Sequence, residues 1–129
     1  DLSNHYAEVT DFIRCFSRDV RMSTNAVLRE GDGDDLRQVL VVGEPPCQVS
    51  FRFYNQRVER EGCIGSPVTT KLWTSLDVGV NKIIGRPGTG GTAVGVTIRW
   101  HRTDAKDPEP NRRFDLIVRC AGELDDEEN

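Results

Sequence analysis

The stretch AVGVTIRW, residues 93–100, alternates bulky side chains with small or polar ones along its whole length. Val94, Val96, Ile98 and Trp100 share one parity, and the residues between them are Gly, Thr and Arg. Successive side chains of a strand point to opposite faces, so this period of two indicates a half-buried β-strand with one bulky face. The stretch therefore sets the expectation of a β-rich fold.

Two further stretches repeat this alternation. In CQVSFRF, residues 47–53, every second residue is apolar, and in FDLIVRC, residues 114–120, only Ile117 departs from the pattern. Weaker strands are predicted at residues 10–16, 19–23, 36–42, 68–73 and 78–84, with a short helix near residues 4–12 as the alternative at the N-terminus. Gly, Pro, Asp and Asn punctuate the intervals, so we expect an all-β antiparallel sandwich.

Length and charge limit the classes of protein to which the chain can belong. Its 129 residues suit one domain, which we place at residues 10–122, after an N-terminal extension over 1–9 and before an acidic tail or linker over 123–129. The net charge is −4, but the tail holds five of the 21 acids, leaving 17 basic against 16 acidic residues in the body. Such a body has no general basic field, which argues against nucleic-acid binding. No apolar run reaches the length of a membrane span, and the start at Asp1 reads as a mature or excised segment.

The four cysteines favour disulfide bonds. Cys15, Cys47, Cys63 and Cys120 form an even set without paired metal-ligand spacing, so zinc is disfavoured; four free core thiols are the more serious alternative. Of the three possible connectivities, strand parity favours Cys15 with Cys120 and Cys47 with Cys63, because Cys120 shares the apolar face of its strand. Disulfides in turn predict a secreted, extracellular protein, with cell-surface anchoring in a longer chain as a variant.

Motifs for catalysis, cofactors and metals are weak in this sequence. The acids of residues 32–35 lack the spacing of a calcium loop, and residues 85–91 lack the GK[ST] ending of a phosphate loop. Ser66 has no nucleophile elbow, and His101 has no partner set that would make it a general base. We therefore predict no catalytic, cofactor or metal site and no enzymatic activity.

The order of cysteines and strands resembles the zona pellucida N-terminal domain family. The resemblance is carried by Cys15 with DVRM after it, by the strand running into Cys47, by the aromatic strand before Gly62 and Cys63, and by FDLIVRC ending at Cys120. It implies an immunoglobulin-like sandwich whose first and fourth, and second and third, cysteines are paired. It also implies a role in filament-forming coats of eggs, epithelia or cuticles, or in recognition between gametes.

Binding of another protein is the expected function, and a sandwich offers strand edges for it. The candidate residues lie at the end of one strand, in the loop after it and at the start of the next; they are Trp100, His101, Arg102, Lys106, Arg112 and Arg113. For Trp100, packing in the core is the stronger interpretation, because its parity matches that of Ile98. The basic stretch over residues 52–60 is a weaker candidate.

The expected partner is a protein, which includes the chain itself in a homo- or heteropolymer or a gamete-surface protein. We expect no nucleic acid and no cofactor, and membrane attachment only through an anchor outside this segment. The alternative function is a free-standing secreted effector, toxin or protease inhibitor on another small disulfide-bonded β-fold. A small hydrolase is disfavoured because no nucleophile, base and orienting group can be assembled.

Overall fold

The structure is a computed structural model that describes residues 2–62, 70–85, 92–100 and 112–121. One long helix, α1, is followed by eight strands. Their bounds are α1 Leu2–Arg21, β1 Ala26–Glu30, β2 Leu36–Glu44, β3 Cys47–Tyr54, β4 Arg57–Glu61, β5 Thr70–Trp73, β6 Asp77–Ile84, β7 Ala93–Trp100 and β8 Arg112–Arg119. Residues 2–9, predicted as an extension, form the start of α1.

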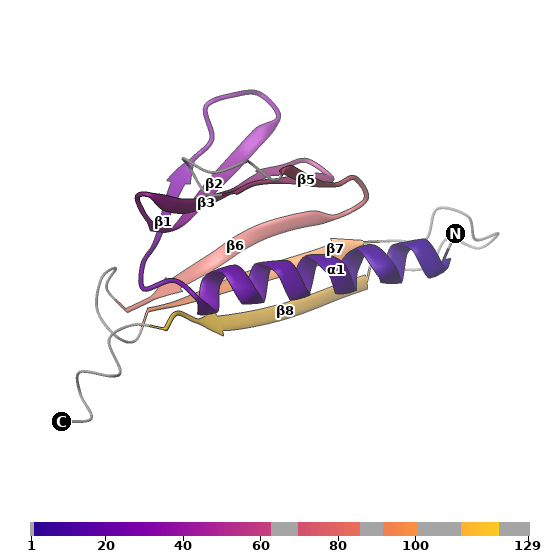
Figure 1. Ribbon diagram of the computed structural model, residues 1–129. Helices are drawn as coiled ribbons and strands as arrows, with labels where there is room; N and C mark the ends of the chain where they lie inside the picture. The colour runs from indigo at the N-terminus through magenta and orange to yellow at the C-terminus, as the bar shows by residue number, and fades with distance from the viewer. Residues whose placement is uncertain (1, 63–69, 86–91, 101–111, 122–129) are drawn as a thin grey trace.

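The strands form two antiparallel sheets, each a meander in chain order. β1 to β5 make a five-stranded sheet, and β6 to β8 make a three-stranded sheet. The sheets meet where β6 contacts β3 and β4, and α1 lies along the open side between them (Figure 1). The predicted β-rich fold of two antiparallel sheets is confirmed. Every described pairing joins chain neighbours, whereas immunoglobulin-like sandwiches have Greek-key connections.

The strands predicted at residues 10–16 and 19–23 are wrong, because this part of the chain is α1 and the turn that ends it. The buried apolar residues recur at intervals of three and four, which is the stripe of an amphipathic helix. They are Val9, Phe12, Phe16 and Val20. The parity of Ile13 and Cys15, on which the strand prediction rested, is a by-product of this longer stripe. The helix also extends well beyond the short helical alternative.

The C-terminal end of α1 is fixed by hydrogen bonds that turn the chain toward β1. The Ser23 hydroxyl donates to the carbonyl of Asp19 at 2.8 Å, and the Ser23 amide donates to the carbonyl of Val20 at 3.1 Å. Arg18 and Arg21 lie in the last turn, where their positive charges interact favourably with the negative end of the helix dipole. Met22 is consequently held at the point where the helix ends.

An aromatic cluster joins α1 to the five-stranded sheet. The Phe12 ring centroid lies 5.2 Å from that of Trp73 on β5 and 5.4 Å from that of Phe16, and Phe16 lies 5.2 Å from Phe51 on β3. These side chains are at most 2% exposed. Buried aromatic side chains contribute strongly to stability, so this cluster anchors the helix between the sheets.

The predicted Cys15–Cys120 disulfide is wrong, because both residues are buried free thiols. The prediction placed Cys15 on a strand, but α1 turns it toward Lys71 of β5, whose Nζ lies 3.8 Å from Cys15 Sγ. Cys120 follows β8, and burial raises the pKa of its thiol. Cys47 is disulfide-bonded. Its predicted partner Cys63 lies outside the described residues, so that pairing stays a prediction.

The only described helix, α1, has an interrupted apolar stripe rather than a continuous apolar run. Among the described residues, no helix is long and apolar enough to cross a membrane.

Candidate functional site

The three described residues of the predicted binding site come together at one end of the three-stranded sheet. In the β7–β8 register Trp100 stands opposite Arg112, and Arg99 stands opposite Arg113. Arg112 and Arg113 are exposed, whereas Trp100 is partly buried and packs against the core, which confirms its interpretation as a core residue. The other candidates, His101, Arg102 and Lys106, lie outside the described residues.

The basic stretch over residues 52–60 is largely engaged within the molecule. Arg52 pairs with Glu61 at 2.8 Å, and this hydrogen bond raises the pKa of Arg52. Arg57 pairs with Asp35 at 2.9 Å. Arg60 forms a nearly buried ion pair with Asp19 of α1, with Nε 2.6 Å from Oδ2. These arginines therefore hold the five-stranded sheet together and tie it to the helix.

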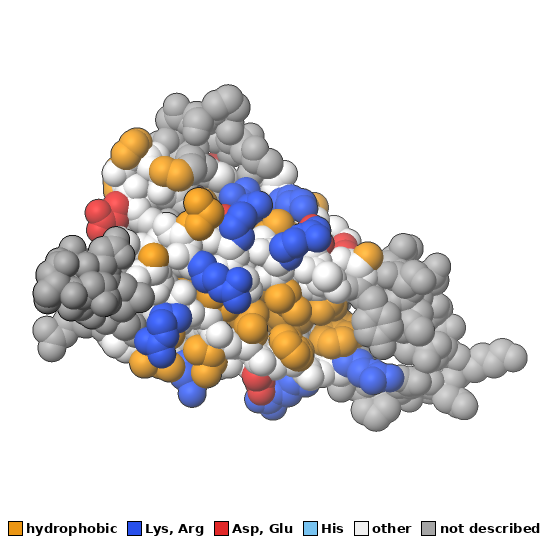
Figure 2. Space-filling model, turned by 60° about the horizontal axis from the view of Figure 1, so that its bottom comes forward, with side chains coloured by type: hydrophobic (Ala, Val, Ile, Leu, Met, Phe, Trp, Pro, Cys, Tyr) orange, Lys and Arg blue, Asp and Glu red, His pale blue; other side chains and the backbone are white. Residues whose placement is uncertain are grey.

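The edge of β8 is a surface on which apolar side chains remain exposed. β8 pairs with β7 over eight residues, and no other described strand pairs with it. Phe114 is 43% exposed and Ile117 is 57% exposed, although both belong to a regular strand. Figure 2 turns this side of the molecule toward the viewer and shows hydrophobic side chains gathered in the middle, with Lys and Arg side chains around them.

Three charged residues of β8, Arg113, Asp115 and Arg119, lie on the sheet face opposite the core. Asp115 accepts hydrogen bonds at Oδ1 from the Thr97 hydroxyl at 2.8 Å and from Arg113 Nε at 3.3 Å. The Thr97 hydroxyl, followed by Arg113, lowers the pKa of Asp115. Arg119 is exposed and forms no ion pair with any residue in the described ranges. The strand thus presents a carboxylate and an unpaired guanidinium four residues apart, on either side of Ile117.

A second surface surrounds Met22, which is 77% exposed. Two hollows flank it, of about 600 Å³ and 510 Å³, and both are lined in part by Arg18 and Met22. We call the lining residues the Met22 surface. It comprises Ile13, Arg14, Ser17, Arg18, Asp19, Arg21, Met22, Ser23, Thr24, Gly43, Glu44, Cys47, Val49 and Arg60.

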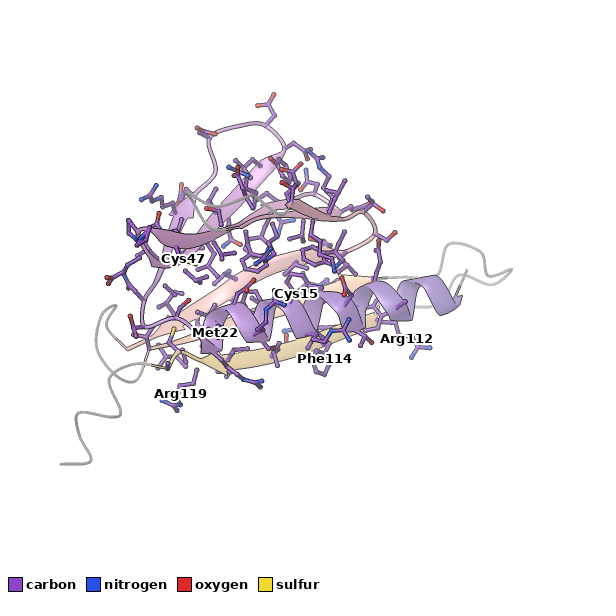
Figure 3. All side chains as sticks on the ribbon, viewed as in Figure 1. Cys15, Met22, Cys47, Arg112, Phe114 and Arg119 are labelled. Atoms are coloured by element: carbon purple, nitrogen blue, oxygen red, sulfur yellow. The ribbon has the colours of Figure 1, made fainter. Side chains whose placement is uncertain are left out.

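The Met22 surface rests on rigid parts of the fold. The buried Arg60–Asp19 pair forms part of its floor, and Arg18 also contacts Asp19 at 3.3 Å. Gly43 brings the β2–β3 turn close to the helix end; a Cβ there would approach the Cys47 carbonyl oxygen to 2.7 Å at a φ of +87°. The amide of Ala121, just after β8, donates to the carbonyl of Ser23 at 2.8 Å. Figure 3 accordingly shows Met22 and Arg119 near the same end of the molecule.

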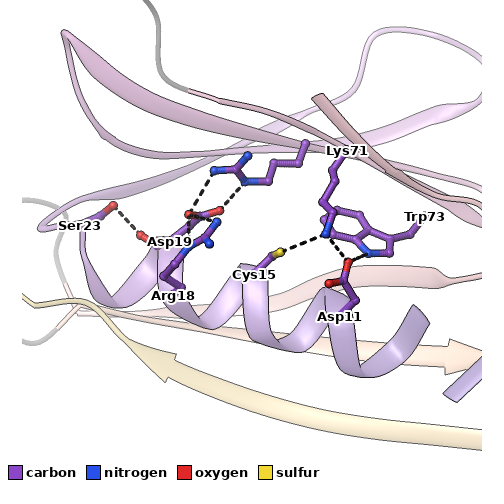
Figure 4. A network of polar contacts seen from close by, with 8 residues as sticks. Asp11, Cys15, Arg18, Asp19, Ser23, Lys71 and Trp73 are labelled. Carbon is purple, nitrogen blue, oxygen red and sulfur yellow. Dashed lines mark hydrogen bonds and ion pairs between the residues drawn. The ribbon is translucent and has the colours of Figure 1, made fainter. Parts of the chain in front are cut away.

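A third cluster, at β5, joins an acid, a lysine and a thiol (Figure 4). Asp11 Oδ2 accepts hydrogen bonds from Lys71 Nζ at 2.6 Å and from the indole of Trp73 at 2.9 Å. The bond with Lys71 lowers the pKa of Asp11, and the same bond raises the pKa of Lys71. Both shifts stabilise the charged forms, so neither group is tuned to exchange a proton near neutral pH. The cluster is better explained as an anchor for α1.

The described residues contain no group of three or more His, Cys, Asp or Glu side chains placed to hold a metal ion. The chain matches no protein-family model, no curated protein and no solved structure. The resemblance to the zona pellucida N-terminal family therefore gains no support from these comparisons. Two features it drew on, a strand at Cys15 and a bond from Cys15 to Cys120, are absent from the structure.

Met22 and Ile117 are the two most exposed of the large apolar residues that the structure describes, and the sequence-based site prediction missed both. Ile117 had left a signal, because it is the one large apolar residue on the wrong parity of its strand. Met22 gave no such signal. It was predicted to lie in a short strand at residues 19–23, and nothing in that prediction indicated the end of a helix.

Proposed function

We propose that this protein is a non-catalytic protein-interaction module, and that its Met22 surface binds an acidic segment of a partner protein. One observation carries the proposal: Met22 is 77% exposed and stands between two hollows lined largely by apolar and arginine side chains. Exposed apolar patches with a polar rim mark interaction sites, and Met and Arg are enriched at protein interfaces.

The charges of the Met22 surface favour an acidic partner. Arg14, Arg18 and Arg21 are exposed around it, whereas Glu44 is its one exposed acid. The carboxylate of Asp19 is neutralised by Arg60. An acidic segment with apolar side chains would pair with the arginines while covering Met22, and such charge complementarity speeds association and selects the partner.

An extracellular location is part of this proposal. The disulfide at Cys47 supports it, because disulfides persist mainly in oxidising compartments. The proposal does not rest on the zona pellucida family.

The test is binding of a labelled peptide, measured by fluorescence anisotropy. The probe carries Glu and Leu at helical spacing, and its matched control carries Lys at each Glu position. We expect the Glu peptide to bind, and the double variant Arg21→Glu with Met22→Asp to weaken binding by about tenfold or more, which is about 1.4 kcal/mol. Arg29→Glu on β1, an exposed arginine outside the Met22 surface, is the matched variant and should change nothing.

Three results would contradict the proposal. Equal binding of the Glu and Lys peptides would remove the charge argument. Binding to vesicles containing phosphatidylserine, without binding of the Glu peptide, would assign the surface to membranes. Displacement of the probe by a synthetic peptide of residues 123–129 at equal concentration would assign it to the acidic tail of the chain itself.

A further inference from the structure

The main-chain groups of β8 alternate in direction, and half of them point away from β7. The amide of Cys120 donates to the carbonyl of Thr92 at 2.8 Å, so the amide of Cys120 points toward β7. Because this direction alternates along an antiparallel strand, the amide and carbonyl groups of Arg113, Asp115, Ile117 and Arg119 point outward. Within the described residues, no strand pairs with these groups.

The β8 edge lacks the bulge and the proline by which many proteins prevent strand pairing. Its pairing with β7 is regular over all eight residues, without the register shifts seen in β2–β3 and β6–β7. It contains no proline; four of its eight residues are apolar and four are charged, with both signs of charge present. A long, regular edge of this kind is a template for another strand, and its charges limit which strand can pair with it.

We propose that β8 pairs with β8 of a second copy of this chain, antiparallel about a two-fold axis at Ile117. This register places Asp115 of each copy opposite Arg119 of the other, so two cross-strand ion pairs flank the axis. A two-fold axis at Asp115 would instead place two Asp115 side chains opposite each other. An axis at Leu116 would place Arg113 opposite Arg119. Like charges directly opposite are destabilising in a sheet, so charge disfavours the axes at Asp115 and Leu116 and favours the axis at Ile117 over both.

The Ile117 register also gives a partner to side-chain groups that lack one among the described residues of the single chain. Arg119 forms no ion pair within the described part of its own chain, and the hydrogen bonds of Asp115 to described residues use only Oδ1. On the core-facing side, Leu116 comes opposite Val118 and Phe114 comes opposite Cys120. This covers Phe114, which is 43% exposed in the single chain. The two three-stranded sheets then form one continuous sheet of six strands.

The first experiment measures the mass of the full chain by sedimentation equilibrium over a concentration series. We expect a mass twice the 14.5 kDa of the chain at high concentration. Arg119→Asp should give a monomer, because it places two pairs of carboxylates opposite each other, and Asp115→Arg should do the same with guanidinium groups. An equimolar mixture of these two variants should associate again, since every cross-strand pair in the mixed dimer joins opposite charges.

The mixed sample distinguishes variants that cannot associate from variants that cannot fold. A monomer at all concentrations up to about 1 mM, the range of a very weak complex, would overturn the proposal. The proposal would also be overturned if the two variants stayed monomeric when mixed as well as singly. This holds provided that Arg119→Asp keeps the circular dichroism spectrum of the parent chain, which shows that it is folded. Met22→Asp should leave the dimer intact, so this result is independent of the function proposed for the Met22 surface.

The second experiment tests the register by crosslinking. On the axis, the two Ile117 Cα atoms form a hydrogen-bonded pair about 5.5 Å apart, a distance that a disulfide spans. Ile117→Cys should therefore give a covalent dimer under mild oxidation, seen by non-reducing electrophoresis. Ile84→Cys, at a 42% exposed isoleucine on β6 of the same sheet, is the matched control and should remain monomeric. A dimer that crosslinks equally through Ile84→Cys would overturn the register.

Discussion

The strands β5 and β8 both lie at sheet edges and α1 packs near both, but among the described residues only β5 is tied to the helix by side-chain hydrogen bonds. At β5, Asp11 of α1 receives hydrogen bonds from Lys71 and from Trp73, and Trp73 is only 2% exposed. At β8, Phe114 and Ile117 remain 43% and 57% exposed, and the outward main-chain groups meet no described strand. One edge is part of the core, and the other leaves apolar side chains exposed.

The difference between the edges lies in how α1 contacts each of them. α1 directs Phe12, Phe16 and Asp11 toward the five-stranded sheet, and the cluster at β5 fixes its position there. The same helix packs against β8 and β7, and the segments that follow α1 and β8 are joined by the hydrogen bond from the Ala121 amide to the Ser23 carbonyl. The outer edge of β8 pairs with no described strand. A protein with one stabilised edge and one open edge can remain stable while it exposes a binding strand.

The largest effect should come from weakening the closed edge at its core. Phe12→Ala removes a ring that contacts Phe16, Phe51 and Trp73. We expect a loss of about 3–5 kcal/mol in the free energy of unfolding, because the cavity adds to the lost burial. Urea unfolding followed by circular dichroism measures it. A loss below about 1 kcal/mol would show that α1 is not the element that closes this edge.

Asp11→Asn should have the next largest effect. The amide keeps the shape of the side chain but removes the charge that Lys71 and the Trp73 indole contact. We expect a loss of about 1–3 kcal/mol, the usual range when a hydrogen bond to a charged group is broken. Asp34→Asn, in the exposed turn before β2, is the matched control, and an equal loss there would contradict the role given to Asp11.

The difference in unfolding free energy between the parent chain and Asp11→Asn should depend on pH. The folded-state pKa of Asp11 is lowered from its ordinary 3.8, so its stabilisation is present above that value and is lost as the pH falls through the folded-state pKa. The pKa of Lys71 is raised from 10.5, so its contribution is present below that value and is lost as the pH rises through the folded-state pKa. Urea unfolding of both proteins should therefore show a constant difference near neutral pH that shrinks at both extremes.

The smallest effect on folding should come from the open edge. Ile117→Lys changes a side chain that is 57% exposed, so at concentrations where the chain is monomeric we expect the unfolding free energy to change by no more than about 0.5 kcal/mol. The same variant should abolish association at high concentration, because it places two lysines together on the proposed axis. A large loss of stability in the dilute monomer would show that β8 is part of the core rather than a free edge.

The strands that the sequence predicted well are those with one buried face. Residues 36–42, 47–53, 78–84 and 93–100 all fall in strands, because burial of alternate residues leaves a period of two in the sequence. β1 and β4 were missed, since their charged residues obscure the alternation. α1 was missed because its second half also shows a short alternation around Ile13 and Cys15, which hides a helical stripe that is evident only over about three turns.

The candidate site was predictable only in part, and for a related reason. Arg112 and Arg113 were predicted as binding residues because basic residues at a strand start are visible in the sequence, and the structure places them at one end of the sheet with Trp100. The Met22 surface draws on α1, β2, β3 and β4, which are far apart in the chain. No local pattern predicts such a combination.

By itself, the sequence determined that most of this chain forms antiparallel strands, because the alternation of side chains records which face of each strand is buried. Only the tertiary structure decided that Cys15 and Cys120 stay separate thiols, that Asp11 secures β5, and that β8 remains an open edge. The physical reason is that a strand edge is covered by residues from elsewhere in the chain. The sequence of the strand does not record which of them reach it.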